Sequence, residues 1–243
     1  MRIKESRSYR GDDRRGEYNF RDYRNNNRRA RDYGDSDREL ANYNLAIGLI
    51  LLYGFGINYL MVRFATPYFL GMNPLLLVVA YFVLALIGIL MSRFSDSPVL
   101  SFIGYTLVVV PLGMVLCVCL ADYGATIIAN TAIVTVLVSF IMMLCGTLFP
   151  RAFLSMGRAL GIALFAVIIV ELICGLLLRL YLPTVWDVLV ALIFCGYIGY
   201  DWANAQLRPH TLDNAIDACV SLYLDIINLF LRILSISGDR YRD

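Results

Sequence analysis

Four carboxylic acids lie within or close to long apolar stretches of this 243-residue chain: Glu171, Asp201, Asp217 and Asp225. A carboxylate at the centre of a membrane span costs roughly 2.5–3.5 kcal/mol on insertion scales, so several of them require partners or a use. Asp225 interrupts the apolar run LYLDIINLFLRIL at residues 222–234. These acids are therefore the candidates for proton or cation chemistry.

The segment around Asp225 predicts a helix with a single polar stripe. Its polar side chains follow one another at intervals of three or four residues: Asp217, Ser221, Asp225, Asn228 and Arg232. At about 100° per residue they occupy an arc of about 80°, and apolar side chains cover the remaining surface. Such a stripe has to be shielded from lipid, so we expect this last helix to be central in a bundle.

Asp201 lies near the end of the preceding apolar stretch. In a plain hairpin that turns at residues 208–210, Asp201 and Asp225 differ in depth by about 10 Å, because each helical residue rises 1.5 Å. The depths match only if residues 208–216 lie along the interface and the last helix begins near Asp217. A contact between the two acids is therefore geometrically possible.

Two carboxylates that meet in a low-dielectric site cannot both ionise cheaply, so such a pair tends to share a proton. Loss of that proton adds repulsion, which loosens the helices or attracts a cation. The pair would then respond to pH. The structural alternative, two separate polar clusters that hold helices together, stays open at this point.

Composition indicates a membrane protein. The chain is 59% hydrophobic with a mean hydropathy of +0.67, whereas soluble domains are about 45–50% apolar. About 20 apolar residues cross the roughly 30 Å hydrocarbon core. We therefore predict an all-α integral membrane domain over residues 41–243, with seven helices at about 41–64, 74–92, 99–121, 126–148, 159–180, 185–204 and 215–236.

Residues 1–40 carry 12 of the 21 Lys and Arg and nine of the 19 Asp and Glu. This segment has no apolar period, so we expect a disordered tail. Its interleaved Arg and Tyr suit RNA or anionic lipid, but a solvated cytoplasmic extension without a nucleic-acid partner is favoured. Arginines in short loops support a cytoplasmic tail. They leave the side of the C-terminus open.

The cysteines all lie in apolar segments without a histidine or a second cysteine cluster. They are Cys117, Cys119, Cys145, Cys174, Cys195 and Cys219. We expect small buried apolar side chains and neither a metal site nor a disulfide.

The motifs YDWANAQ at residues 200–206 and SLYLDIINLFLRIL at residues 221–234 resemble the C-terminal signature of the Bax inhibitor-1 family. The 24-residue separation of Asp201 and Asp225 fits the family pattern. Two further segments, GYTLVVVPLGMVLCVCLADY and ANTAIVTVLVSF, are similar to the third and fourth helices of the family. The resemblance covers residues 45–236. It implies a last helix ringed by six others, in a protein embedded in the lipid bilayer of the bacterial inner membrane.

The resemblance also implies a pH-dependent calcium leak that is closed by the Asp201–Asp225 pair. Calcium would be the permeant ion, and both acids would bind it transiently. No cofactor is expected. In some members a basic residue after the second helix latches the pair, and Arg93 is the candidate here. The polar stripe and Glu171 supply candidates for lining the path: Asp217, Ser221, Asn228, Arg232 and Glu171.

Glu171 has no family counterpart. Some bacterial members have a glutamate in the second helix, where this chain has Tyr81. Glu171 either replaces that carboxylate or, as we favour, hydrogen-bonds a neighbouring helix while protonated.

Parts of the sequence also suit two other functions. Intramembrane aspartyl proteases use a Tyr-Asp motif, as in Tyr200-Asp201, together with a G-x-G-D motif. Bulky Leu222 and Leu224 stand where the glycines would be. Leucine obstructs access of a substrate backbone, so we expect no enzyme activity. The second alternative is a non-transporting regulator of a membrane-anchored AAA protease or of a stress response, in which the charged tail acts.

Overall fold

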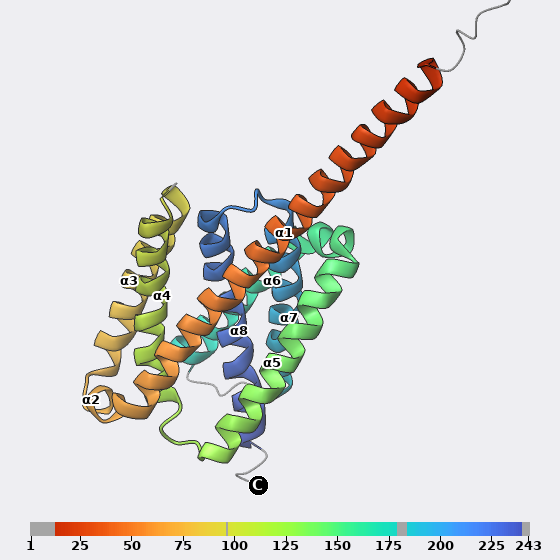
Figure 1. Cartoon of the computed structure of the whole chain (residues 1–243). Helices are drawn as coiled ribbons and strands as arrows, with labels where there is room; N and C mark the ends of the chain where they lie inside the picture. The colour runs from red at the N-terminus through yellow and green to blue at the C-terminus, as the bar shows by residue number, and fades with distance from the viewer. Residues whose placement is uncertain (1–12, 96, 179–183, 240–243) are drawn as a thin grey trace, which may run out of the picture. The chain divides into compact units, whose positions relative to one another are not determined.

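The computed structural model describes residues 13–95, 97–178 and 184–239 (Figure 1). The chain divides into two units, Met1–Asn42 and Tyr43–Asp243. In the first unit, the described backbone is the beginning of helix α1 (Asp13–Phe64), although we expected no regular structure before residue 41. This polar sequence has no apolar face that packing could stabilise. The disorder of the tail in solution stays a prediction, and residues 1–12 lie outside the described residues.

The second unit is built from helices, and the described residues contain no strand. After the remainder of α1 the elements are α2 (Thr66–Leu70), α3 (Pro74–Phe94), α4 (Pro98–Cys119), α5 (Ala125–Leu148), α6 (Pro150–Leu172), the π-helical turn η1 (Ile173–Leu177), α7 (Thr184–Leu207) and α8 (Leu212–Asp239).

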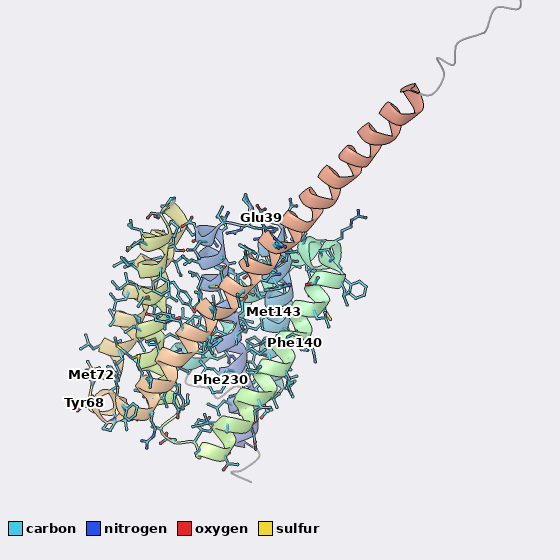
Figure 2. All side chains as sticks on the ribbon, in the orientation of Figure 1. Glu39, Tyr68, Met72, Phe140, Met143 and Phe230 are labelled. Atoms are coloured by element: carbon cyan, nitrogen blue, oxygen red, sulfur yellow. The ribbon has the colours of Figure 1, made fainter. Side chains whose placement is uncertain are left out.

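Seven of these helical segments are long and apolar enough to cross a bilayer. They are Arg38–Phe64, Leu75–Phe94, Pro98–Cys119, Ala125–Leu148, Pro150–Gly175, Thr184–Leu207 and Leu212–Gly238. Their outer faces carry large apolar side chains, such as Leu52, Phe82 and Phe140, that are more than half exposed (Figure 2). Lipid is the solvent that suits such a surface. The predicted all-α integral membrane protein with seven spans is confirmed.

Two predicted helix boundaries differ from the structure. The fifth span begins at Pro150 rather than at residue 159, because proline is well placed in the first helical turn, where its missing N–H is not needed. The last helix begins at Leu212 rather than at residue 215, so only four residues connect it to α7. The polar run before Asp217 is therefore helical.

Helix α8 is the most buried of the seven spans, and it packs against α3, α4, α5 and α7 (Figure 1). An aromatic contact joins it to α4, and a hydrogen bond joins it to α1. Tyr223 meets Tyr105 edge to face at 5.6 Å between ring centroids. Asn58 donates a hydrogen bond to the hydroxyl of Tyr223, and the hydroxyl of Tyr105 donates to the carbonyl oxygen of Ile50 at 3.1 Å. These hydrogen bonds hold α8 in place inside the bundle, although Oδ1 of Asn58 accepts no hydrogen bond from the described residues.

Helices α3 and α4 pack closely against each other. A Cβ atom added to Gly104 would lie 2.6 Å from the carbonyl oxygen of Gly88 and 2.9 Å from the backbone nitrogen of Ser92. Glycine at both positions lets the two backbones touch, which is a common way of packing helices in membranes.

Candidate functional site

Asp201, in the last third of α7, and Asp225, in the middle of α8, interact directly through their carboxyl groups. A hydrogen bond between two carboxyl groups requires a proton on one of them. Asp225 is only 7% exposed, and its Oδ2 atom accepts no hydrogen bond from any N–H or O–H donor of the described residues. Asp225 therefore lies inside the bundle, away from bulk water, whereas Asp201 is partly exposed.

The contact forms although α8 begins earlier than the ideal hairpin geometry required. The expected difference of about 10 Å in depth between the two acids holds for straight, parallel helix axes. The direction of the axes alone does not determine which side chains meet. Local sequence helps the approach: a Cβ atom on Gly146 of α5 would lie 2.6 Å from the carbonyl oxygen of Gly199. Small residues thus draw α7 into the bundle, close to α8.

Charged and polar groups surround the pair at longer range. Asp201 lies in the electrostatic field of Arg208 and Arg93. The hydroxyl of Tyr197, one turn before Asp201, lies in the field of both acids. Two arginines thus lie near the two acids: Arg93 at the end of α3 and Arg208 in the α7–α8 connection. Arg93, the latch candidate, is one of these two arginines.

A second polar cluster joins the beginning of α8 to α3 and α4. Ser92 donates a hydrogen bond to Asp217, and Ser101 donates one to Oδ1 of Asp213 at 2.7 Å. Asp217 and Ser221 also line a cavity of about 100 Å³ together with Arg93. The sequence reading missed Asp213, although its four-residue spacing from Asp217 extends the polar stripe by one turn.

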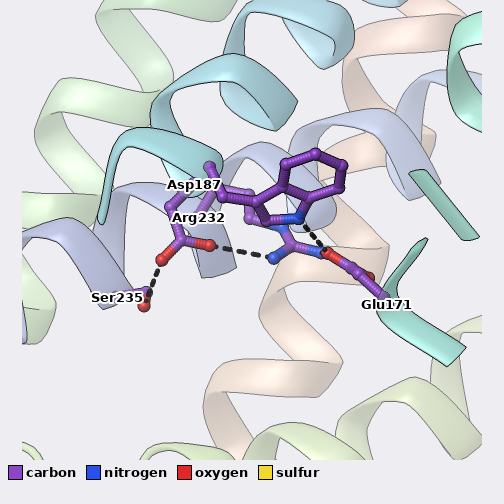
Figure 3. Close-up of polar contacts among 5 residues, drawn as sticks. Glu171, Asp187, Arg232 and Ser235 are labelled. Carbon is purple, nitrogen blue, oxygen red and sulfur yellow. Dashed lines mark hydrogen bonds and ion pairs between the residues drawn. The ribbon is translucent and has the colours of Figure 1, made fainter. Parts of the chain in front are cut away.

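A third cluster lies near the end of α8 (Figure 3). Arg232 contacts Glu171 of α6 at 2.5 Å and Asp187 of α7 at 2.9 Å. Ser235 donates a hydrogen bond to Oδ2 of Asp187 at 2.8 Å, and the indole nitrogen of Trp186 donates to Glu171 at 3.1 Å. Arg232 thus bridges two acids from two other helices.

This cluster corrects the expectation for Glu171. The side chain does hydrogen-bond a neighbouring helix, as we favoured, but its main partner is the guanidinium of Arg232. An arginine is always charged, so Glu171 has a cation as its partner in addition to the neutral indole of Trp186. Asp187 was not among the sequence candidates. Its position in the first turn of α7, where acids interact favourably with the helix dipole, was the available signal.

A cavity of about 460 Å³ opens beside this third cluster. Its lining combines residues from α4, the α4–α5 connection, α7 and α8: Val118, Cys119, Asp122, Tyr123, Asp187, Asn228, Leu231, Arg232, Leu234 and Ser235. The amide of Asn228 donates to the carbonyl oxygen of Leu224 at 2.8 Å. Neither this cavity nor the smaller one is lined by Asp201 or Asp225. The polar side chains of α8 therefore belong to three separate clusters.

Within the described residues no group of three or more His, Cys, Asp or Glu could hold a metal ion. The transient calcium contact expected at Asp201 and Asp225 involves two acids only. All six cysteines are free; Cys117 and Cys219 are buried, but Cys119 is exposed. The prediction of burial is wrong for Cys119, because the apolar run at this end of α4 borders the large cavity.

Comparison with known proteins agrees with this architecture. Residues 40–242 match the family model described as "Inhibitor of apoptosis-promoting Bax1". The chain is 29% identical over 192 residues to Bax inhibitor 1 of Schizosaccharomyces pombe, an alignment that covers 75% of this chain and 68% of the yeast protein.

Shorter alignments show higher identity. The chain is 56% identical over 52 residues to Protein LIFEGUARD 3 of Arabidopsis thaliana, covering 21% of each chain. It is 40% identical over 84 residues to an uncharacterised protein of Helicobacter pylori, covering 35% of this chain and 36% of the other. The alignments with LIFEGUARD 3 and LIFEGUARD 4 span 21% and 33% of those plant proteins. Since the family model covers most of the chain and all seven membrane spans lie almost wholly within the match, the protein belongs to the Bax inhibitor-1 family.

Proposed function

We propose that this protein is a pH-sensitive calcium leak channel in which the Asp201–Asp225 pair is the gate. The observation that carries the proposal is the direct contact between two carboxyl groups, one from α7 and one from α8, inside the bundle. Neighbouring charges of this kind change the protonation of both groups, so a pair responds to pH where a single exposed acid would not.

The gate works through the shared proton. With the proton present, one carboxyl group donates a hydrogen bond to the other and α7 stays bound to α8. Without it, two negative charges face each other in a medium of low dielectric constant, where their repulsion is strong. The repulsion separates the helices or draws a cation between the two acids, and both outcomes favour passage of a divalent cation.

Polar groups at both ends of α8 support a path along this helix. Asp217 lies toward its beginning, and Asp187 lies beside its end. Calcium prefers carboxylate and other oxygen ligands, which are the ligands available at these positions. We further propose that the Arg-rich N-terminal segment is cytoplasmic and that the membrane is a bacterial inner membrane, following the distribution of arginine and the resemblance described above.

The burial around Asp225 favours a leak over a protease. Leu222 and Tyr223, which precede Asp225, have no exposed surface. A protease must admit a substrate backbone beside its catalytic acids, and these side chains fill that space.

Asp201→Asn tests the proposal in proteoliposomes loaded with a calcium indicator. Asparagine keeps the size of aspartate and a hydrogen bond to Asp225, but it removes the titrating group. We expect the calcium flux to change by less than about twofold between about pH 6 and pH 8, because the proton linked to opening is lost. Asp213→Asn, at an acid that is paired with a serine hydroxyl, is the matched control and should keep the wild-type pH profile. If Asp201→Asn keeps that profile as well, the gate is wrong.

Arg93→Ala tests the latch. Removing this positive charge makes the ionised acids less favourable, so the midpoint of the flux–pH curve should rise by about half a pH unit while flux persists. Arg158→Ala in α6 removes the same charge elsewhere and should leave the midpoint unchanged. An equal midpoint in wild type and Arg93→Ala excludes Arg93 from the gate.

A further inference from the structure

The large cavity at the end of α8 is acidic despite its arginine. Its charged lining consists of Asp122, Asp187 and Arg232, so the carboxylates outnumber the cation by two to one. Glu171 contacts Arg232 from α6 and adds a further negative charge. A concave site with a net negative charge and low-dielectric walls concentrates cations.

Arg232 occupies the place between two carboxylates where a free cation would be most stable. One guanidinium nitrogen is 2.9 Å from Oδ1 of Asp187 and another is 2.5 Å from Oε1 of Glu171. The hydroxyl of Ser235 and the amide oxygen of Asn228 belong to the same part of α8 and line the same cavity. These are oxygen donors of the kind that divalent calcium accepts.

We propose that this cavity is the vestibule through which a divalent cation approaches the Asp201–Asp225 pair, and that Arg232 is a tethered cation which the ion displaces from Glu171 and Asp187. The inference rests on the proposed leak and extends it to one end of the path. Arg232 follows Asp225 by seven residues, or about 10 Å along α8, so the vestibule lies two helical turns from the gate.

Displacement follows from the chemistry of the two partners. While Arg232 is bound between the acids, its charge offsets theirs and lowers the attraction of the cavity for cations. When it leaves, Asp187 faces the cavity as a free carboxylate, and Glu171, which is not part of the cavity lining, loses its ion-pair partner. Trp186 and Ser235 each donate a hydrogen bond to one of them, which keeps both carboxylates in position. Arg232 therefore sets the charge selectivity of the vestibule.

Cys119 allows the charge of the vestibule to be measured without measuring ion flux, because this exposed thiol lines the cavity. The experiment uses the full chain with its other five cysteines replaced by alanine, in proteoliposomes. The rates at which a cationic and an anionic methanethiosulfonate modify Cys119 are compared. In Arg232→Gln, the ratio of the cationic to the anionic rate should rise about tenfold over the parent protein, since local charge controls the concentration of each reagent. Arg158→Gln is the matched control and should leave the ratio unchanged.

Further variants separate a charge effect from simple loosening of the bundle. Arg232→Lys keeps the charge and should keep the parental ratio. Combining Arg232→Gln with Glu171→Gln and Asp187→Asn should bring the ratio back toward the parental value, whereas a loosened bundle would stay accessible to both reagents. If Arg232→Gln does not fold, Glu171→Gln/Asp187→Asn with Arg232 intact should shift the ratio about tenfold toward the anionic reagent. An unchanged ratio in a folded variant of either kind overturns the vestibule.

Calcium provides the remaining arm of the test. Added calcium should slow the cationic modification of Cys119 more strongly in Arg232→Gln than in the parent, because the two carboxylates are then free to bind it. Equal protection in both proteins contradicts displacement of Arg232 by the ion. These readouts do not depend on transport. A wild-type flux without pH dependence would refute the aspartate gate but not the vestibule. A pH-dependent flux together with an unchanged ratio of modification rates at Cys119 would refute the vestibule but not the gate.

Discussion

Asparagine in place of Asp225 should remove most of the pH dependence of calcium flux in proteoliposomes. In wild type, one proton coupled to opening permits a change of up to about tenfold per pH unit, and without it we expect less than about twofold between about pH 6 and pH 8. The amide of asparagine donates a hydrogen bond to Asp201 much as protonated aspartate does, and it cannot be ionised. The variant should therefore show, at every pH, the flux that wild type shows at the acidic end of the range.

The effect of Asp225→Asn should equal that of Asp201→Asn and exceed that of any other single acid, because of the surroundings of Asp225. It is 7% exposed, and Oδ2 accepts no hydrogen bond from donors in the described part of the chain. Its protonation therefore depends first on its burial and then on the neighbouring Asp201. The double variant Asp201→Asn/Asp225→Asn should flatten the profile no further than either single variant, since both changes remove the same shared proton. Two additive effects would mean that the acids titrate independently, which contradicts a common gate.

Valine in place of Gly104 should cause the largest loss of stability among the packing variants. Its Cβ atom would lie 2.6 Å from the carbonyl oxygen of Gly88 and 2.9 Å from the backbone nitrogen of Ser92. Both are main-chain atoms, so α3 and α4 have to move apart rather than adjust a side chain. Overpacking of this kind costs about 1–3 kcal/mol. The measurement is the thermal unfolding midpoint of the purified protein in detergent.

Gly161 in α6 offers the matched control, because no atom lies within 4 Å of a Cβ atom added there. Gly161→Val carries the same change of residue into a membrane helix and should melt close to wild type. The displacement caused by Gly104→Val also reaches the hydrogen bonds from Ser92 to Asp217 and from Ser101 to Asp213, since both serines belong to this helix pair. A Gly104→Val protein that melts like Gly161→Val would show that α3 and α4 do not touch in solution.

The interpretation of α8 as one continuous stripe illustrates how far periodicity reaches. Asp217, Asp225 and Arg232 do share one side of the helix by their spacing, yet Asp217 contacts α3, Asp225 contacts α7, and Arg232 contacts α6 and α7. Periodicity states which side of a helix is polar. It does not state which neighbour stands opposite that side at each depth, because α8 passes several helices along its length.

The amino-acid sequence by itself determined the class of protein, the seven spans and the two acids of the candidate gate. These properties are local: hydrophobic length decides whether a segment crosses the bilayer, and a charge inside an apolar run is visible without knowing its neighbours. Only the tertiary structure decided that Asp201 and Asp225 meet, that Asp187 joins Arg232, and that Glu171 is paired with a cation. Contacts between distant segments depend on how helices approach one another, which the spacing of residues within a single helix does not encode.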